Sequence, residues 1–334
     1  MNRLAAVKTH VRSALFMLFT MLMLTGCHAL QNSDAAMEAP DIPEEQPVQS
    51  QPANTTAADD TEHGLSKENQ NDAAIETPPD TDCKAELFME GIVSKKGSTE
   101  YTLNIWDDHA LFVRFGSGIP DYTAFEMKRI DGEWQEPVVS ELFKDAGCYL
   151  PAVDRAGENV YFVLPESLDM YPPEIWTTPV DGMGPPQFIC RGMYPSVSES
   201  GNLYYGYNGR LRCRKHSDEG YGEMEGLKGD ILVSQEDAHP CISWDESYII
   251  FDSSERAGVR DNDLFVSFQS EDGTWSEAFN LGQFLGMDNS GLARISADGE
   301  SIYFHSDGDI YRMDTEVIEA IKTNEHPPGA ENRA

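Results

Sequence analysis

The chain has 334 residues, of which 24 are basic and 58 are acidic, and its formal net charge is −34. With 40% apolar and 10% aromatic residues, the composition is typical of a globular protein and excludes a wholly disordered chain. The negative charge excludes nucleic acid as a partner, because phosphate binding needs a basic surface, and it excludes a basic patch that docks on anionic lipid.

The N-terminus has the organisation of a secretory signal peptide. Basic residues between positions 3 and 12 precede an apolar run of eleven residues, Ala14–Leu24, which is too short to span a bilayer. The following Leu24-Thr25-Gly26-Cys27 resembles the bacterial lipoprotein box. The resemblance implies that residues 1–26 are removed and that Cys27 carries acyl chains such as palmitate, which hold the protein at a membrane. An ordinary signal peptide with a chance cysteine is the alternative.

The resemblance to lipoproteins also bears on location. His28 follows the cysteine, where an aspartate would act as a retention signal for the inner membrane. The resemblance therefore implies an outer-membrane lipoprotein that faces the periplasm or the cell surface.

Residues 27–82 are predicted to be a disordered acidic tether. Positions 31–82 contain six prolines, thirteen acidic residues, one lysine and no aromatic residue. Such a stretch buries too little apolar surface to offset the entropy lost on folding. A flexible chain of this length spans roughly 40 Å, so the tether would hold the folded part away from the membrane. Residues 326–334 are predicted to be a disordered tail.

Residues 83–325 contain internal repeats. Each unit has an apolar residue, a short turn rich in Asp or Gly, and a pair of aromatic or apolar residues. The apolar residues that mark the units are Leu103, Val153, Val197, Ile242 and Ile295. Asp-Gly pairs at 131–132 and 272–273 predict hairpins, because tight turns need a positive φ. Four strands in a unit of about 45 residues are typical of an all-β fold, the β-propeller.

The last unit lacks a fourth strand. After its third strand, Asp309–Met313, the chain enters a predicted short helix, Glu316–Ile321. The segment Ala85–Ser94 precedes the first unit and has no partner there. We expect this N-terminal strand to complete the last blade, because ring closure removes two exposed sheet edges. Five marks predict five blades; six is the alternative if a degenerate blade lies within Lys215–Ala238.

Three units resemble the WD40-like repeats of TolB-like propellers, whose signature is Pro-x-apolar-Ser-Pro-Asp-Gly before an aromatic strand. The matching segments are Pro195–Ser198, Pro240–Ser243 and Ile295–Gly299, and the strands Asp263–Phe268 and Asp309–Tyr311 are also similar. The resemblance covers residues 83–325 and implies the propeller fold. It implies no TolB-like role, because TolB has an additional N-terminal domain where this chain has the predicted tether.

The sequence contains no motif that identifies an enzyme. Gly-x-Ser-x-Gly, the phosphate-binding loop, Cys-x-x-Cys and His-x-x-x-His are all absent. Asp154, Asp252 and Asp263 lie near predicted loops. Two carboxylates roughly 5 to 9.5 Å apart can hydrolyse a glycosidic bond. If the protein is an enzyme, these three are the candidate catalytic residues of a carbohydrate-active hydrolase with a central funnel.

Four side chains are candidates for ligand binding at the rim of the channel. Trp106 and Trp244 fall in turns after the first strand of a unit, where an indole can stack on a ligand. His239 and Arg256 are the other two. Arg256 is also expected to order its loop through an ion pair with Asp261 or Asp263.

Calcium is the one cofactor for which the sequence offers candidate ligands. Asp261-Asn262-Asp263 and Asp307-Gly308-Asp309 carry oxygen ligands, but neither continues as an EF-hand loop. The alternative is that these side chains bond to their own backbone in turns. No other cofactor or metal is expected.

Five cysteines remain after Cys27, namely Cys83, Cys148, Cys190, Cys213 and Cys241. The envelope permits disulfides, and an odd number leaves at least one cysteine unpaired. Cys190 and Cys213 lie in adjacent units and are candidates for a bridge between blades. Cys241 is expected to be buried.

The sequence favours a membrane-anchored β-propeller lipoprotein of the bacterial cell envelope. It is expected to act as a binding module with a protein or glycan partner at the propeller rim. The alternative is the carbohydrate-active hydrolase.

Overall fold

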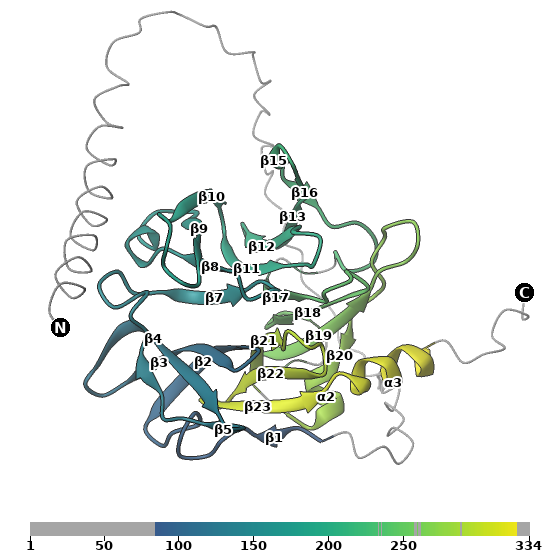
Figure 1. Ribbon diagram of the computed structural model, residues 1–334. Coiled ribbons are helices and arrows are strands. Elements are labelled where there is room, and N and C mark those ends of the chain that lie inside the picture. The colour runs from purple at the N-terminus through teal and green to yellow at the C-terminus, as the bar shows by residue number, and fades with distance from the viewer. Residues whose placement is uncertain are drawn as a thin grey trace, which may run out of the picture. The chain divides into compact units, whose positions relative to one another are not determined.

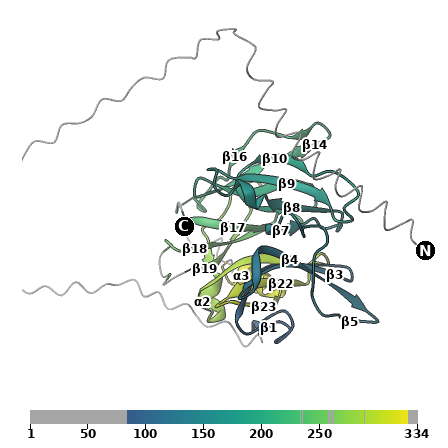
Figure 2. The same ribbon diagram turned by 90° about the vertical axis from the view of Figure 1, so that its left-hand side faces the viewer.

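A computed structural model describes residues 84–325, except positions 233, 235, 257, 258, 260, 261 and 288. The predicted signal peptide, Cys27, tether, Cys83 and tail lie outside the described residues. Five antiparallel sheets are arranged as the blades of a β-propeller, as Figure 1 and Figure 2 show. The predicted all-β architecture with five blades is confirmed.

The blades follow one another along the chain, and each begins with its innermost strand. Blade A contains β2 (Ser98–Trp106), β3 (His109–Gly116), β4 (Ile119–Ile130), β5 (Glu133–Trp134) and β6 (Val138–Val139). Blade B contains β7 (Tyr149–Val153), β8 (Asn159–Val163), β9 (Glu174–Pro179) and β10 (Gln187–Arg191). Blade C contains β11 (Met193–Val197), β12 (Leu203–Tyr207), β13 (Arg210–Arg214) and β16 (Glu225–Gly226). Blade D contains β17 (Asp237–Ile242), β18 (Tyr248–Ser253), β19 (Asp263–Phe268) and β20 (Phe279–Asn280). Blade E contains β21 (Ser290–Ile295), β22 (Ser301–Ser306), β23 (Asp309–Asp314) and β1 (Glu86–Leu87).

The N-terminal strand closes the ring as predicted. In β1, Glu86 pairs with Arg312 and Leu87 pairs with Tyr311 of β23. The Ser94 hydroxyl donates to the carbonyl of Ile310 (3.1 Å), and the Ile310 amide donates back to it (3.0 Å). Blade E is therefore built from both ends of the folded chain.

The segment proposed as a sixth blade has other roles. Within Lys215–Ala238, β14 (His216–Ser217) and β15 (Gly220–Tyr221) form an additional hairpin, and β16 is the fourth strand of blade C. The hypothesis of six blades is therefore wrong.

Each innermost strand has a bulge at the same point. The register shifts in all five, and the bulge contains one residue with a positive φ of 48° to 60°, namely Thr102, Leu150, Tyr194, His239 or Leu292. A bulge adds one residue to a strand and turns nearby side chains. Counting from the bulge, Ile105 and not Leu103 is the equivalent of Val153, so the mark chosen in the first unit was wrong by two residues.

The core lies between the blades. Every residue of β19 and β21 is buried, because neighbouring blades cover both faces of these strands. Two short helices add to the packing, α2 (Leu281–Leu285) and α3 (Glu316–Glu325). In α3, Val317, Ile318 and Ile321 pack on the apolar cluster shared by blades D and E. Among the described residues, no helix is long and apolar enough to cross a membrane.

The four described cysteines are buried and free. The predicted bridge between Cys190 and Cys213 is wrong, because the two thiols lie on opposite sides of blade C. Cys190 packs with Tyr205 towards blade B, whereas Cys213 packs with Tyr204 towards blade D. Cys241 is buried, as predicted.

Candidate ligand-binding site

One end of the propeller axis carries an aromatic side chain from every blade. We call this set the mouth ring; its members are His305, Tyr101, Phe115, Tyr122, Tyr149, Tyr194 and His239, and all seven are half-buried. Ring centroids are 5.0 Å apart for Tyr101 and His305, and 5.3 Å for Tyr122 and Tyr149. Phe115 lies between Tyr101 (5.3 Å) and Tyr122 (5.7 Å). The mouth ring is therefore a nearly continuous aromatic surface.

The bulges explain why these side chains come together. Tyr101 and Tyr149 directly precede the bulge residue of their strands, whereas Tyr194 and His239 are bulge residues themselves. Burial raises the pKa of Tyr149, and the nearby Tyr194 phenol raises it further, so blades B and C also meet here. Four of the five equivalent bulges thus direct a polar aromatic group to one end of the axis, and in blade E this place is taken by His305, which pairs with Gly291 beside the bulge.

His239 is held by a buried carboxylate. Its Nδ1 lies 2.9 Å from both carboxylate oxygens of Asp252. The Asp252 side chain is 3% exposed, and its Oδ2 also accepts the Leu292 amide at 2.9 Å. A Cβ atom on Gly291 would come within 2.5 Å of that oxygen, so glycine permits this close approach. With Nδ1 held by the carboxylate, Nε2 points away from Asp252, and no described residue bonds to it.

A guanidinium group closes the axis beneath the mouth ring. Arg294 belongs to blade E, yet its Nε donates to the Pro151 carbonyl of blade B (3.2 Å) and its Nη2 to the Pro195 carbonyl of blade C (3.4 Å). Blades B and C are the two that do not adjoin blade E, so this side chain crosses the interior of the ring. It is 4% exposed, and burial lowers its pKa. Arg294 therefore links blades B, C and E beneath the mouth ring.

His305 is held in its neutral form. Burial lowers its pKa to about 4, and the carboxylate of Asp307 only partly opposes that effect. Its Nε2 accepts a hydrogen bond from the Gly308 amide at 3.0 Å. The proton of the neutral ring is therefore on Nδ1, so His305 offers the mouth ring an imidazole donor.

The three candidate catalytic carboxylates are not brought together. Asp252 pairs with Leu264 and Asp263 with Ser253 across β18 and β19, so their side chains lie on opposite faces of blade D. Asp154 lies at the other end of an innermost strand and accepts hydrogen bonds from its own turn. Only Asp252 belongs to the candidate site.

The four candidate rim residues are divided between the two ends of the axis. His239 is part of the mouth ring. Trp106 and Trp244 lie at the opposite end of the innermost strands, and the Trp244 indole donates to the Ser296 carbonyl at 2.9 Å. Arg256 is buried and bonds to both carboxylate oxygens of Asp237, at 3.0 and 2.7 Å. Arg256 thus forms an ion pair with Asp237, which is not one of the two expected partners.

The candidate calcium ligands make hydrogen bonds of their own. Asp263 accepts the Asn280 amide at 2.9 Å, and Asp307 accepts the Asn289 amide at 3.0 Å. Asp261 lies outside the described residues. In the described part of the chain, no three His, Cys, Asp or Glu side chains are grouped as metal ligands.

The tyrosines of the mouth ring were missed in the sequence analysis. Tyr149 stands four residues before Val153, and Tyr101 stands four residues before Ile105. The sequence therefore contains a shared pattern, a tyrosine four residues before the apolar mark of the unit. This pattern can be recognised only when Ile105 is taken as the mark of the first unit.

No family model matches the chain, and no curated protein matches it in sequence. Solved structures similar to it include TolB from Acinetobacter baumannii, with 16% identity and a TM-score of 0.37 over 66% of this chain and 51% of TolB. An arabinanase from Bacillus subtilis has 11% identity and a TM-score of 0.43, over 66% of this chain and 94% of that one. A gluconolactonase from Xanthomonas campestris has 10% identity and a TM-score of 0.38, over 71% and 96%. The chain thus spans about half the length of TolB, and its neighbours are propeller-like proteins.

Proposed function

We propose that the protein is a lipid-anchored β-propeller of the bacterial cell envelope that binds a protein or glycan at the mouth ring. The lipoprotein box at Cys27 and the acidic composition of residues 31–82 support the anchor and the tether. The outer membrane is the proposed location, with the propeller in the periplasm or at the cell surface.

The observation that carries the proposal is the mouth ring itself. Aromatic faces bind sugar rings and apolar side chains, while phenol and imidazole groups at their edges supply hydrogen bonds. The imidazole of His239 is held in a fixed direction by Asp252, and no described residue bonds to its Nε2. Beneath this surface, Arg294 connects the innermost strands of blades B, C and E.

The geometry supports binding better than glycoside hydrolysis. That reaction needs two carboxylates that face one another across the scissile bond. Asp252 is the one candidate carboxylate at the mouth ring, and it is already engaged by His239 and the Leu292 amide.

A photo-crosslinker tests the proposed binding surface in cells. Tyr171 is 75% exposed and lies close enough to Tyr194 to raise its pKa, so it is next to the mouth ring. We expect benzoylphenylalanine at position 171 to capture a discrete protein partner. Phe188 is the matched control position. It is 49% exposed and lies on β10 of blade B, the blade to which Tyr171 also belongs.

The outcomes separate the two classes of partner. Capture from position 171 but not 188 supports a protein partner. If nothing is captured, binding on a glycan array that Tyr149→Ala abolishes supports a glycan. Equal capture from both positions, or neither capture nor glycan binding, would overturn the proposal. The anchor is tested separately, because Cys27→Ser must abolish palmitate labelling and membrane attachment.

A further inference from the structure

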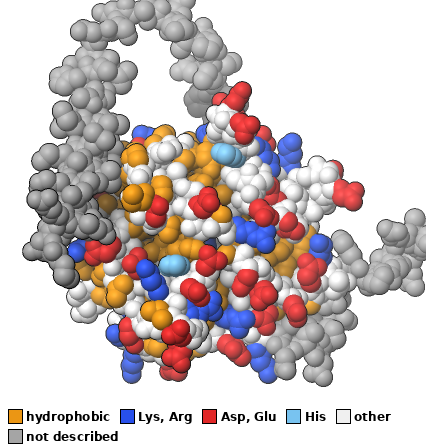
Figure 3. Space-filling model, viewed as in Figure 1, with side chains coloured by type: hydrophobic (Ala, Val, Ile, Leu, Met, Phe, Trp, Pro, Cys, Tyr) orange, Lys and Arg blue, Asp and Glu red, His pale blue; other side chains and the backbone are white. Residues whose placement is uncertain are grey.

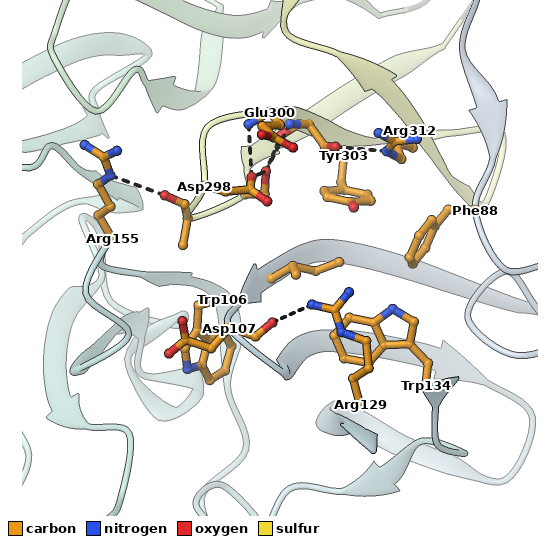
Figure 4. A pocket seen from close by; sticks show the side chains of 14 residues that line it. Phe88, Trp106, Asp107, Arg129, Trp134, Arg155, Asp298, Glu300, Tyr303 and Arg312 are labelled. Atoms are coloured by element: carbon orange, nitrogen blue, oxygen red, sulfur yellow. Dashed lines mark hydrogen bonds between the residues drawn. The ribbon is translucent and has the colours of Figure 1, made fainter. Parts of the chain in front are cut away.

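A pocket lies at the opposite end of the innermost strands from the mouth ring, between blades A and E (Figure 4). Its volume is about 630 Å³, which is within the range of sites for small molecules. It is lined by Trp106 and Ile105 at the end of β2 and by the β21–β22 turn. It is thus separate from the mouth ring.

Three guanidinium groups line this pocket. Arg129 comes from β4, Arg155 from the turn after β7, and Arg312 from β23. In the chain as a whole, acidic residues outnumber basic residues by more than two to one, whereas this pocket is lined by three arginines and three acidic residues. Figure 3 shows acidic side chains spread widely over one face of the molecule. The pocket is therefore unusually rich in positive charge for this protein.

All three arginines are held in place and still have a free donor. Arg312 donates from Nε to Ser301 (2.9 Å) and from Nη2 to Asp314 (2.7 Å). Arg129 donates from Nε to Asp108 (2.9 Å) and from Nη2 to the Asp107 carbonyl (2.9 Å). Arg155 donates from Nε to the Ala297 carbonyl (3.2 Å) and from Nη1 to Glu199 (2.6 Å). The remaining amino nitrogen of each has no partner among the described residues. Such oriented guanidinium donors suit a carboxylate group.

The acidic residues of the pocket differ in whether their carboxylates are free to accept hydrogen bonds from a ligand. Burial opposes ionisation of Asp298, but hydrogen bonds from Ser296 and the Glu300 amide, together with the charges of Arg129 and Arg312, lower its pKa. The negative charge of Asp298 is therefore already balanced by these groups. The exposed side chains of Asp107 and Glu300 have no hydrogen-bond partner in the described part of the chain, so they can accept bonds from an ammonium group.

An aromatic wall completes the pocket. The ring of Trp134 lies 5.1 Å from the guanidinium carbon of Arg129, and its indole nitrogen makes no hydrogen bond to a described residue. Phe88 packs edge-on against Tyr303, with ring centroids 4.9 Å apart. This wall can cover an apolar side chain that lies between two charged groups of a ligand.

We infer that this pocket binds a short zwitterionic peptide. Its carboxylate lies against Arg129, and Arg312 adds to the favourable field. Its ammonium group lies against Asp107 or Glu300, and an apolar side chain packs on Trp134. The inference does not depend on the proposed function, because the two sites are at opposite ends of the propeller.

Calorimetry on the full chain in detergent tests the inference with three forms of one tripeptide, Ala-Leu-Ala. The free form should bind, and Trp106 and Trp134 should report it by fluorescence. N-acetylation and C-terminal amidation should each weaken binding by about tenfold, since each removes a charge-assisted contact. Equal affinity for the three forms, or no binding of the free form at millimolar concentration, would overturn the inference. Competition by inorganic phosphate at equal concentration would show a simple anion site and would also overturn it.

Two matched variants locate the binding. Arg129→Gln should weaken binding of the free peptide about tenfold and abolish the discrimination between carboxylate and amide. Its ion pair with Asp108 is exposed, so its loss should hardly change stability. Arg210→Gln makes the same change of charge on β13 of blade C and should leave binding unchanged. If both variants weaken binding equally, the effect is one of net charge and not of this pocket.

Discussion

The Nε of Arg294 donates a hydrogen bond to the carbonyl of Pro151, 3.2 Å away and on a blade that does not adjoin its own. The same side chain bonds to Pro195, so one guanidinium group connects the innermost strands of three blades. This connection positions β7 and β11, whose bulges carry Tyr149 and Tyr194 of the mouth ring.

Lysine cannot replace this arginine. An ammonium group lacks the planar fork that reaches two carbonyls at once, so Arg294→Lys leaves a buried carbonyl poorly satisfied. We expect a loss of about 1 to 3 kcal/mol in the free energy of unfolding, measured by denaturant titration. Arg210→Lys should change it by less than about 0.5 kcal/mol. Equal stability of Arg294→Lys and the native protein would contradict the connecting role.

Glu246 joins blades C and D through hydrogen bonds to its carboxylate. The donors are the side chains of Ser198, Ser200, Asn202, Tyr204 and Lys215. Burial opposes ionisation, but these bonds lower the pKa of Glu246 to about 2. Its stabilisation is therefore complete above the unfolded pKa of 4.5 and is lost as the pH falls towards 2.

Glu246→Gln should cost about 1 to 3 kcal/mol at pH 7, because an amide cannot accept all of these bonds. The difference from the native protein should shrink as the pH falls from 4.5 to 2. Denaturant titrations across that window measure it, and a difference that does not vary with pH would contradict the assignment.

His305 has an effect of the same direction in a higher pH range. Its pKa falls from 6.5 to about 4 on folding, so between these values the unfolded chain takes up a proton that the folded chain does not. Stability should therefore fall as the pH drops from 6.5 to 4. His305→Gln should flatten this part of the stability curve. Titration of the imidazole by NMR measures the pKa directly, and a value near 6.5 would refute the prediction.

Gly157 allows Trp106 to pack against its turn. A Cβ atom at this position would lie 2.2 Å from the indole, and the φ of +68° is itself unfavourable for other residues. We expect Gly157→Ala to cost more than about 2 kcal/mol. At Gly132 φ is +84° and nothing lies within 4 Å of an added Cβ atom. Gly132→Ala therefore measures the cost of the backbone conformation alone, which should be about 1 kcal/mol. Equal losses in thermal denaturation would show that the indole moves aside.

The sequence predicted the fold well because a propeller repeats its local pattern. The turns after Val153 and Ile242 and the missing fourth strand of the last unit were sufficient to predict five blades closed by the N-terminal strand. The site was harder, since its members come from five blades. His239 and Asp252 were both named, but their contact depends on the bulge in β17, which changes the register that simple alternation would give.

Contacts between loops also could not be predicted from the sequence. Arg256 was expected to pair with a nearby aspartate in the following residues. It pairs instead with Asp237 at the start of β17, because β17 and β18 are antiparallel and bring that residue to the same end of the blade. Likewise, Trp106 and His239 were grouped as one rim although their positions are at opposite ends of innermost strands.

Closure of blade E by β1 has a consequence for the order of folding. Ser94 and Ile310 are bonded across 216 residues, so the segment that contains β1 and Ser94, although it is synthesised before the other strands, has no partner until the last strands have been made. The entropy of closing so long a loop grows only slowly with length, but such non-local contacts make folding slow. Completion of the ring is therefore a late step, and a chain that ends before β23 leaves β1 without a partner, however well its first four blades have formed.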